Sequence, residues 1–437
     1  MQGYLKWTAA CAAVLVAATA CGGGGSKKSS STPSAGQSLK GVHLDLYATW
    51  SGGEQKNFQK VLDAFHAKTG ATVTYTSTGD NMATVLGSKL AGGQPPDIAL
   101  LPQPGLIADY AAKNQIKPLT PAVQQLVTQN YAKTWQDLAT VNGKLYGVFW
   151  KAANKSTVWY RTAAFQQAGI QPPTSWADLV KDAGTLSDSG TPAFDIGGAD
   201  GWTLTDWFEN VYLSQAGPAN YDKLAKHQIK WTDPTVKTAL KTIAQIWANP
   251  KLIAGGSGSA LQTDFPTSVK NVFGDSPKAA MVYEGDFVAT NILETKSKIG
   301  TDANFFPFPA VGQTPPVTGG GDAAVMLKDN PGSQALMAFL ASPEAATIDV
   351  KLGGFTSPNK GVTFDSYADP IQRKIAQGVI QAGDTFRFDM SDQAPATFGG
   401  TKGAGEWKDL QDFLAKPSDV DGTAAKLEAD AAKAFKS

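Results

Sequence analysis

The chain has 437 residues, and its 38 Lys and Arg residues balance 38 Asp and Glu residues, for a formal net charge of +0 at pH 7. A length near three times the usual domain of about 150 residues predicts two or three hydrophobic cores. The balanced charge excludes the basic surface of a nucleic-acid-binding protein and gives no polybasic patch for anionic lipid. With only 2 Cys and 3 His, no zinc-type cluster can form, and we expect neither metal nor cofactor.

The first segment predicts export. Residues 8–20 form an apolar run of small residues that is too short to span a membrane as a helix, as is typical of a signal peptide. The run ends in Ala18-Thr19-Ala20-Cys21, which resembles the lipobox of bacterial lipoproteins. That resemblance implies removal of residues 1–20 and lipidation of Cys21, with residues 21–40 as a flexible Gly/Ser/Pro-rich tether. The alternative is an ordinary cleaved signal before a disordered N-terminus; in both cases the mature chain works outside the cytoplasm.

Residues 41–101 predict a parallel β-sheet. Alternating polar and apolar residues predict strands at 43–49 and 72–78, and an apolar run predicts a third at 97–101. Apolar residues at helical spacing predict one helix between each pair of strands, the first ending at Gly70. Such a unit makes the first domain α/β, and its ligands are expected at the carboxyl ends of the strands. These ends lie at residues 50–52, 79–81 and 102–104.

The rest of the chain becomes increasingly helical. Asn142-Gly143 predicts a hairpin turn, and Val158-Trp159-Tyr160 predicts a further strand. Thr174 is expected to be the N-cap of a helix that begins near Trp176. Further helices are predicted at 206–216, 236–248, 333–341, 371–378 and 423–435.

Motifs for nucleotide binding and for nucleophilic hydrolysis are absent from the sequence. It contains no GxxxxGK[ST], no GxGxxG and no GxSxG. The run Gly319-Gly320-Gly321 has neither glycine spacing, so we expect a flexible or closely approached turn there. A carboxylate pair of the glycosidase type remains open, with Glu54, Glu209 and Glu284 as the candidates nearest to aromatic or glycine-rich segments.

Aromatic residues stand beside hydrogen-bonding residues at several predicted turns. Flat rings stack on the apolar faces of sugars, while charged and amide groups bind the hydroxyls. The pairs are Trp50 with Ser51, Trp150 with Lys151, Trp202 and Trp207 around Asp206, and Phe386-Arg387-Phe388-Asp389. Together they favour a carbohydrate-binding cleft.

The chain from about Gly41 to the C-terminus resembles the family 1 extracellular solute-binding proteins of bacterial ABC importers, the maltose-binding-like carbohydrate binders, and especially their α-glucoside-binding branch. The order and spacing of several short stretches carry the resemblance. They are Thr49-Trp50-Ser51-Gly52-Gly53-Glu54, Pro95-Pro96-Asp97-Ile98-Ala99, Gly143-Lys144-Leu145-Tyr146-Gly147-Val148, Pro173-Thr174-Ser175-Trp176, Lys278-Ala279-Ala280-Met281, Phe305-Phe306-Pro307-Phe308-Pro309, Gly320-Gly321-Asp322 and Gly353-Gly354-Phe355-Thr356-Ser357-Pro358-Asn359-Lys360.

The resemblance implies a two-lobe α/β fold of the periplasmic-binding-protein type II, with a ligand cleft between the lobes and hinge crossovers. Residues 41–152 and 302–348 would form lobe 1, and residues 153–301 and 349–437 would form lobe 2. Maltose binders often have Pro-Trp after the Glu-Gly pair, whereas this chain has Asp286-Phe287. The residues carried over as ligand-binding are Trp50, Ser51, Glu54, Asp80, Gln103, Trp202, Trp207, Tyr283, Glu284, Asp286, Asp322, Phe355, Arg387 and Asp389.

The function implied is that of a non-enzymatic binding protein. It would be a monomer, anchored by lipid to the outer face of the membrane of a Gram-positive bacterium, that binds a neutral sugar and delivers it to a permease driven by a separate ATPase. The sugar would be an α-glucoside such as a maltose-type or trehalose-type disaccharide. Two alternatives stay open: a secreted glycoside hydrolase, and a binder of peptides, polyamines or siderophores on the same scaffold.

Overall fold

The computed structural model describes residues 38–312, 314–367, 369–382 and 385–436, all of which belong to the unit Pro33–Ser437. The predicted signal peptide, Cys21 and nearly all of the predicted tether lie outside the described residues.

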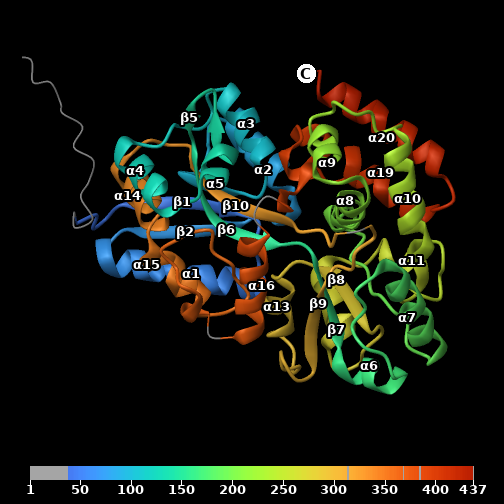
Figure 1. The fold of residues 1–437 in the computed structure, drawn as a ribbon. Helices are drawn as coiled ribbons and strands as arrows, with labels where there is room; N and C mark the ends of the chain where they lie inside the picture. Colours follow the sequence, from blue (N-terminus) through green and yellow to red (C-terminus); the bar gives the residue numbers. More distant parts are fainter. Residues whose placement is uncertain (1–37, 313, 368, 383–384, 437) are drawn as a thin grey trace, which may run out of the picture. The chain divides into compact units, whose positions relative to one another are not determined.

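A six-stranded sheet forms one half of the fold (Figure 1). Its strands are β1 (His43–Ala48), β2 (Thr72–Ser77), β3 (Ile98–Leu101), β6 (Gly147–Asn154), β10 (Thr318–Met326) and β11 (Arg387–Phe388). β1 pairs in parallel with both β2 and β3, which confirms the predicted parallel unit. β10 runs antiparallel to β3 and β6. We call this the large sheet.

A three-stranded sheet forms the second half. Its central strand is β7 (Thr157–Arg161), which runs antiparallel to β8 (Met281–Glu284) and β9 (Ala303–Pro307). β6 of the large sheet continues into β7 through the two residues Lys155 and Ser156, so the chain passes from one sheet to the other at this point (Figure 1). We call this the small sheet.

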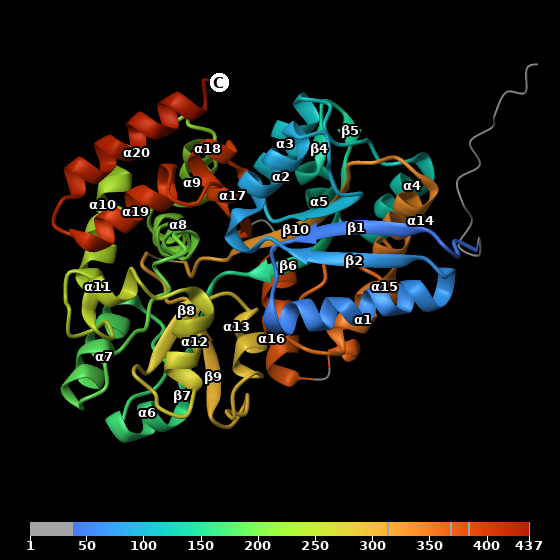
Figure 2. The ribbon, with the colours of Figure 1, turned by 180° about the vertical axis from the view of Figure 1, so that it is seen from behind.

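Helices surround both sheets (Figure 2). Those next to the large sheet include α1 (Gly52–Thr69), α2 (Met82–Ala91), α3 (Pro104–Ala112), α4 (Pro121–Asn130), α5 (Lys133–Leu138), α14 (Pro331–Leu340), α15 (Pro343–Val350) and α16 (Pro370–Gln381). The others are α6 (Thr162–Ala168), α7 (Trp176–Asp188), α8 (Trp202–Ala216), α9 (Pro218–Ala225), α10 (Pro234–Trp247), α11 (Gly256–Ala260), α12 (Phe265–Phe273), α13 (Val288–Ile292), α17 (Met390–Gln393), α18 (Ala396–Gly399), α19 (Gly405–Ala415) and α20 (Val420–Ala434). Short pieces are η1 (Gly79–Asn81), η2 (Phe364–Ser366), β4 (Thr140–Val141) and β5 (Lys144–Leu145).

The predicted ends and turns of these elements are mostly confirmed. Gly70 ends α1 in the left-handed conformation, at φ 79°, and donates its N–H to His66. Asn142 and Gly143, both at positive φ, form the turn between β4 and β5. The N-cap of α7 is Ser175, not Thr174, because the Ser175 hydroxyl accepts the N–H of Asp178 at 3.2 Å.

The triple glycine is not a turn; it lies inside β10, where every residue is buried. A Cβ at Gly321 would lie 2.4 Å from the Lys151 carbonyl oxygen of β6, and one at Gly319 would lie 2.6 Å from that of Ala153. The glycines therefore let β10 and β6 approach more closely than side chains would allow. The predicted close approach is confirmed, but it lies between two strands and not in a turn.

Two segments pack differently from the predicted division into lobes. β9 pairs with β7 of the small sheet, although residues 302–348 were expected in lobe 1. Phe355, Tyr367 and Ala376 belong to the hydrophobic cluster of β1 and α1, although residues 349–437 were expected in lobe 2. The strand pairing and the apolar packing thus place two of the three crossings between the halves later in the chain than the sequence indicated.

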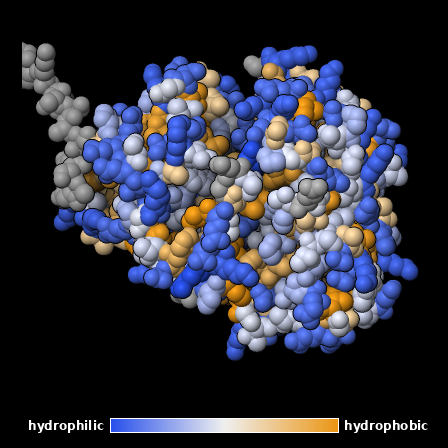
Figure 3. Space-filling model, in the orientation of Figure 1, coloured by the Kyte–Doolittle hydropathy of each residue, from blue (hydrophilic) through white to orange (hydrophobic). Residues whose placement is uncertain are grey.

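The face seen in Figure 3 is mostly hydrophilic, with apolar residues in small separate groups. Among the described residues, the large hydrophobic side chains classed as exposed are Leu293, Leu352 and Ile380. Within the same part of the chain, no helix combines the length and the hydropathy needed to cross a membrane.

Candidate functional site

A cavity of about 550 Å³ lies where the loops of the large sheet face the helices of the small sheet. One wall consists of the segments that follow β1, β2 and β3, including Trp50, Asp80 and Gln103. The opposite wall comes from Asp200 and Trp202 at the start of α8, from Phe265 of α12 and from Phe287 before α13. This volume is in the range of sites that enclose a small molecule.

Seven of the fourteen predicted ligand-binding residues line this cavity: Trp50, Ser51, Glu54, Asp80, Gln103, Trp202 and Asp322. All but Trp202 and Asp322 belong to the strand ends of the predicted parallel unit or directly follow one. Their meeting follows from the topology, because the carboxyl ends of parallel neighbours lie at one edge of a sheet.

Lys151 of β6 is buried at the base of this wall. Its ammonium group forms an ion pair with Glu54 of α1 and lies 5.6 Å from the ring centre of Trp50 and 4.9 Å from that of Phe287. Burial disfavours its charge, but Glu54 and Asp322 raise the pKa of Lys151 above its usual value. Burial raises the pKa of Asp322 to about 6, against the opposing effect of Lys151. The pair of Lys151 with Glu54 therefore holds two rings and two charges in fixed positions.

A second lysine, Lys155, lies where β6 passes into β7. Its ammonium group lies 3.2 Å from Asp206, 3.5 Å from Asp392 and in direct contact with Asp389. Burial acts against its charge, yet Asp206 and Asp389 raise the pKa of Lys155 well above its usual value. Lys155 also lies 5.7 Å from the ring centre of Trp202.

The carboxyl groups around Lys155 have unequal affinities for protons. Burial raises the pKa of Asp392 to about 8, and the negative charge of Asp389 adds to this effect. Burial also acts against ionisation of Asp389, but Lys155 lowers the pKa of Asp389 below its usual range. Asp389 is therefore the carboxylate that neutralises Lys155, whereas Asp392, which lines the cavity, holds a proton at neutral pH.

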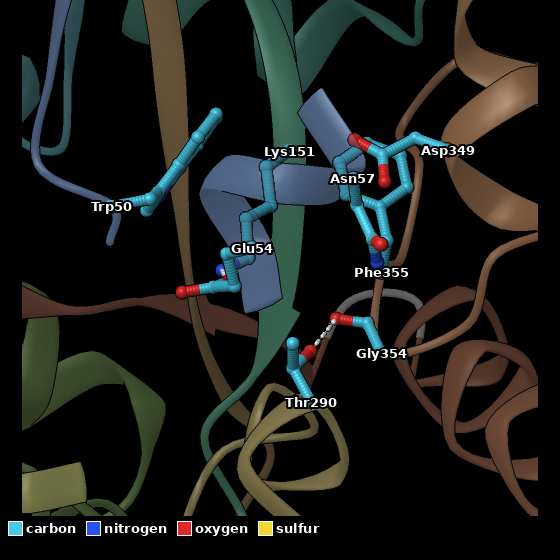
Figure 4. Close-up of a pocket in the computed structure, with 8 residues that line it drawn as sticks. All are labelled: Trp50, Glu54, Asn57, Lys151, Thr290, Asp349, Gly354 and Phe355. Carbon is cyan, nitrogen blue, oxygen red and sulfur yellow. Dashed lines mark hydrogen bonds and ion pairs between the residues drawn. The ribbon is translucent and has the colours of Figure 1, made fainter. Parts of the chain in front are cut away.

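Behind Trp50 lies a second, much smaller cavity of about 10 Å³ (Figure 4). In this view Glu54 and Lys151 lie between Trp50 on one side and Asp349 and Phe355 on the other. Burial raises the pKa of Asp349 to about 7, and Glu54 adds to the effect. The space is close to the minimum for one water molecule among polar groups. The predicted residue Phe355 lines this small cavity and not the large one.

The remaining predicted residues do not line the large cavity. Trp207 is 2% exposed and packs in the core against Phe194 and Tyr283. The Tyr283 hydroxyl donates to backbone carbonyl oxygens, and Arg387 pairs with Asp222 at 2.6 Å. The others are buried behind the cavity wall: Glu284, Asp286 and Asp389.

The candidate catalytic acids have structural partners or lie away from the cavity. Glu209 accepts the N–H groups of Met390 and Ser391 at 2.8 and 3.0 Å, and so anchors the start of α17. Glu284 lies in β8, and burial raises its pKa to about 8. Of the three, only Glu54 lines the cavity, where it pairs with Lys151.

Sequence reasoning did not identify Lys155, Asp200 or Lys402 as cavity residues. A signal existed for Lys155, because it is a charged residue between the apolar stretches Val148-Phe149-Trp150 and Val158-Trp159-Tyr160. Asp200 and Lys402 lie in glycine-rich turns that carry no comparable pattern. Tertiary packing alone brings them to the cavity.

The α/β fold is that of the periplasmic sugar-binding proteins of the maltose-binding type. The solved structure of a chitin oligosaccharide binding protein superimposes with a TM-score of 0.77, at 21% identity, over 91% of this chain and 99% of that chain. At that identity the likeness concerns the fold.

Residues 49–347 match the bacterial extracellular solute-binding protein family, and the chain belongs to that family. It is 34% identical to the alpha-glucosides-binding periplasmic protein AglE of Rhizobium meliloti, over 90% of this chain and 88% of the relative. It is also 34% identical to the osmoprotective compounds-binding protein GgtB of Synechocystis, over 85% of this chain and 88% of that protein. These relatives are binding proteins, and the family places the chain outside the cytoplasm.

Proposed function

We propose that this protein is the solute-binding component of an ABC importer, and that it captures a neutral sugar or oligosaccharide of the α-glucoside class and delivers it to a permease. The name of the relative AglE supports the α-glucoside class, while that of GgtB extends the candidates to small osmoprotective compounds.

The observation that carries this proposal is the chemistry of the large cavity. Trp50 lies on one wall, and Trp202 and Phe287 lie on the other, so a flat ligand can stack on aromatic rings from both sides. Between them, Lys151 is paired with Glu54 and Lys155 with Asp389, and the lining carboxyl groups can accept hydrogen bonds from hydroxyls. A neutral polyhydroxylated ligand matches these groups without leaving a buried charge unpaired.

Isothermal titration calorimetry of the purified mature protein tests the proposal. The panel contains maltose, trehalose, a β-linked disaccharide, a monosaccharide, an uncharged polyol, a peptide, a polyamine and a siderophore. We expect saturable binding of an α-linked glucoside and no sugar released on long incubation. Release of monosaccharide would identify a glycoside hydrolase instead, and binding confined to the peptide, polyamine or siderophore would replace the sugar proposal.

We also propose that the chain is a monomer held at the outer face of the membrane of a Gram-positive cell by a lipid on Cys21. The short apolar segment before Cys21 and the Gly/Ser-rich residues after it support this anchor. Mass spectrometry of the membrane fraction should find a diacylglyceryl group on Cys21, and Cys21→Ala should release the protein from the membrane. A soluble protein whose N-terminal residue carries no lipid would contradict the anchor.

We further propose that the two halves form two lobes that close on the ligand. The separate sheets, joined through Lys155 and Ser156 between β6 and β7, support a hinge there. Small-angle scattering should show a smaller radius of gyration with ligand than without. An unchanged radius at saturation would refute closure.

A further inference from the structure

Two polar contacts join the halves of the protein at the rim of the large cavity. The first joins Asp80 of η1 to Lys402, which follows α18. The second joins the N-terminus of α1 to Glu294, which follows α13. Figure 2 shows α13 beside the start of α1, with α2 in a different part of the molecule near α17.

At the first contact, Lys402 lies between two carboxylates. Its ammonium nitrogen is 3.4 Å from Asp80 and 3.3 Å from Asp200. Met82, next to Asp80, packs in a cluster with β3 and α3, whereas Leu204, close to Asp200, packs in the core around α8. Lys402 is therefore a cation shared between acids of the two halves. Without it, two negative charges would face each other across the cavity.

At the second contact, the carboxylate of Glu294 acts as the cap of α1. Ser51 is the N-cap residue but makes no side-chain cap hydrogen bond. Instead the N–H of Gly53 donates to Glu294 Oε1 at 2.7 Å. The first N–H groups of a helix lack internal partners and attract negative charge, so this 18-residue helix binds the carboxylate of the opposite half.

Glycine at position 53 permits this contact. A Cβ there would lie 2.7 Å from the Thr290 methyl carbon, and one at Gly52, which has φ 59°, would lie 2.7 Å from Glu294 Oε1. Lys270 supports the same carboxylate from the small-sheet side at 3.4 Å. The close fit and the hydrogen bond are independent signs that the two surfaces are shaped to meet.

We propose that Lys402 and Glu294 are positioning residues of the binding cycle: they hold the cavity closed over the ligand and thereby set how fast the ligand leaves. This inference rests on the proposed function. Both residues line the cavity, but each of these contacts joins protein to protein and exists without a ligand. An exposed ion pair such as Lys402 with Asp80, and a carboxylate such as Glu294 at a helix N-terminus, are each worth a few tenths to about 1 kcal/mol. This predicts roughly two- to fivefold faster dissociation when either residue is truncated.

Stopped-flow tryptophan fluorescence with the best ligand of the calorimetric panel measures the dissociation rate. We expect Lys402→Ala and Glu294→Ala each to raise this rate, and the double variant to raise it by the product of the two factors, because the sites do not share partners. In Lys402→Arg and Glu294→Gln the dissociation rate should stay close to that of the native protein. The matched control is Lys408→Ala, since Lys408 is similarly exposed but pairs with Asp412 of its own helix.

Salt separates this role from a structural one. Dissociation from the native protein should accelerate between 20 and 500 mM salt, and Lys402→Ala should be less sensitive, because screening acts on the ion pair that this variant lacks. Unchanged rates in both alanine variants, with thermal stability preserved, would overturn the inference while leaving sugar binding intact. Absence of any sugar binding in the native protein would instead refute the proposed function, and the two contacts would then be tested with the ligand found in its place.

Steric exclusion gives a second test that leaves both charged residues in place. Gly53→Ala should hold α1 away from α13 and speed dissociation. Adding Thr290→Ser removes the methyl group that the new Cβ would meet and keeps the hydroxyl that donates to Gly354 at 3.2 Å. A return to the native dissociation rate in the double variant would support the role of this contact in holding the cavity closed. Equal dissociation rates in the native protein and Gly53→Ala would overturn that role.

Discussion

Trp202 and Trp207 are five residues apart on the same helix, but the structure assigns them different tasks. Trp202 lines the cavity and packs against Phe265 at a ring distance of 5.4 Å. Trp207 is fully enclosed, with four further aromatic rings near it besides Tyr283, whose ring centre is 4.7 Å away. Truncation of the first should therefore weaken binding, and truncation of the second should weaken folding.

For Trp207→Ala, the loss of buried surface and the cavity left behind predict about 3–5 kcal/mol less free energy of unfolding. Trp207→Phe keeps most of the volume and should cost less, about 1–2 kcal/mol. For Trp202→Ala we expect about 1–2 kcal/mol less binding free energy, or roughly 5- to 30-fold in Kd, with little change in stability.

Urea unfolding measures the first quantity and calorimetry with the identified ligand measures the second. Trp207→Phe keeps the test decisive if Trp207→Ala does not fold. A Trp207→Phe protein of native stability that had lost affinity as strongly as Trp202→Ala would refute the assignment of Trp207 to the core.

Four further outcomes follow from individual residues. Gly321→Ala should cost several kcal/mol in urea unfolding, because its Cβ would meet a β6 carbonyl oxygen at 2.4 Å; native stability would contradict the close approach. Lys155→Met should cost about 3–5 kcal/mol by leaving the buried carboxylate of Asp389 unpaired. The loss should be smaller at pH 5 than at pH 8, because Asp389 without the lysine takes up a proton more readily; equal loss at both pH values would contradict that cause. Ser175→Ala should cost about 1 kcal/mol and Thr174→Ala almost nothing; the reverse order would restore Thr174 as the cap. Burial raises the pKa of Glu284 to about 8, so the folded protein keeps a proton that the unfolded chain releases. The free energy of unfolding should therefore fall as pH rises from about 4.5 to 8, by at most about 1.4 kcal/mol per pH unit. Glu284→Gln should flatten this slope, and an unaltered slope would assign it to other carboxyl groups.

The parallel unit could be predicted from the sequence because local periodicity decides it. Alternation over 43–49 and helical spacing of Phe58, Val61, Leu62 and Phe65 are both properties of short segments, and these four side chains are buried as expected. The place of β10 could not be read in the same way. Its first half is a glycine run with no periodicity, and it becomes a central strand because β6 and β3 supply partners from distant parts of the chain.

The cavity was predictable on one wall and not on the other for the same reason. Trp50, Asp80 and Gln103 each follow a strand of one parallel unit, so topology alone brings them together. On the other wall, a ring beside a polar residue occurs both in the core and at the surface. The pattern around Asp206 is the same for Trp202 and Trp207, and only the packing of α8 against α10 and α19 decides which ring faces the cavity.

Positive charge at the large cavity is neutralised locally, because the lining carboxyl residues outnumber the lining lysines by seven to four. Each of its four lining lysines has a carboxylate partner: Lys151 with Glu54, Lys155 with Asp389, Lys270 with Glu294, and Lys402 with Asp80. An anionic ligand would have to compete with these carboxylates for a cation, and at the two buried lysines, Lys151 and Lys155, separating the ion pair costs several kcal/mol. A ligand whose hydroxyls donate to the carboxylate oxygens leaves every pair in place. The pairing of these lysines therefore acts, at the cavity, as selection against anionic solutes.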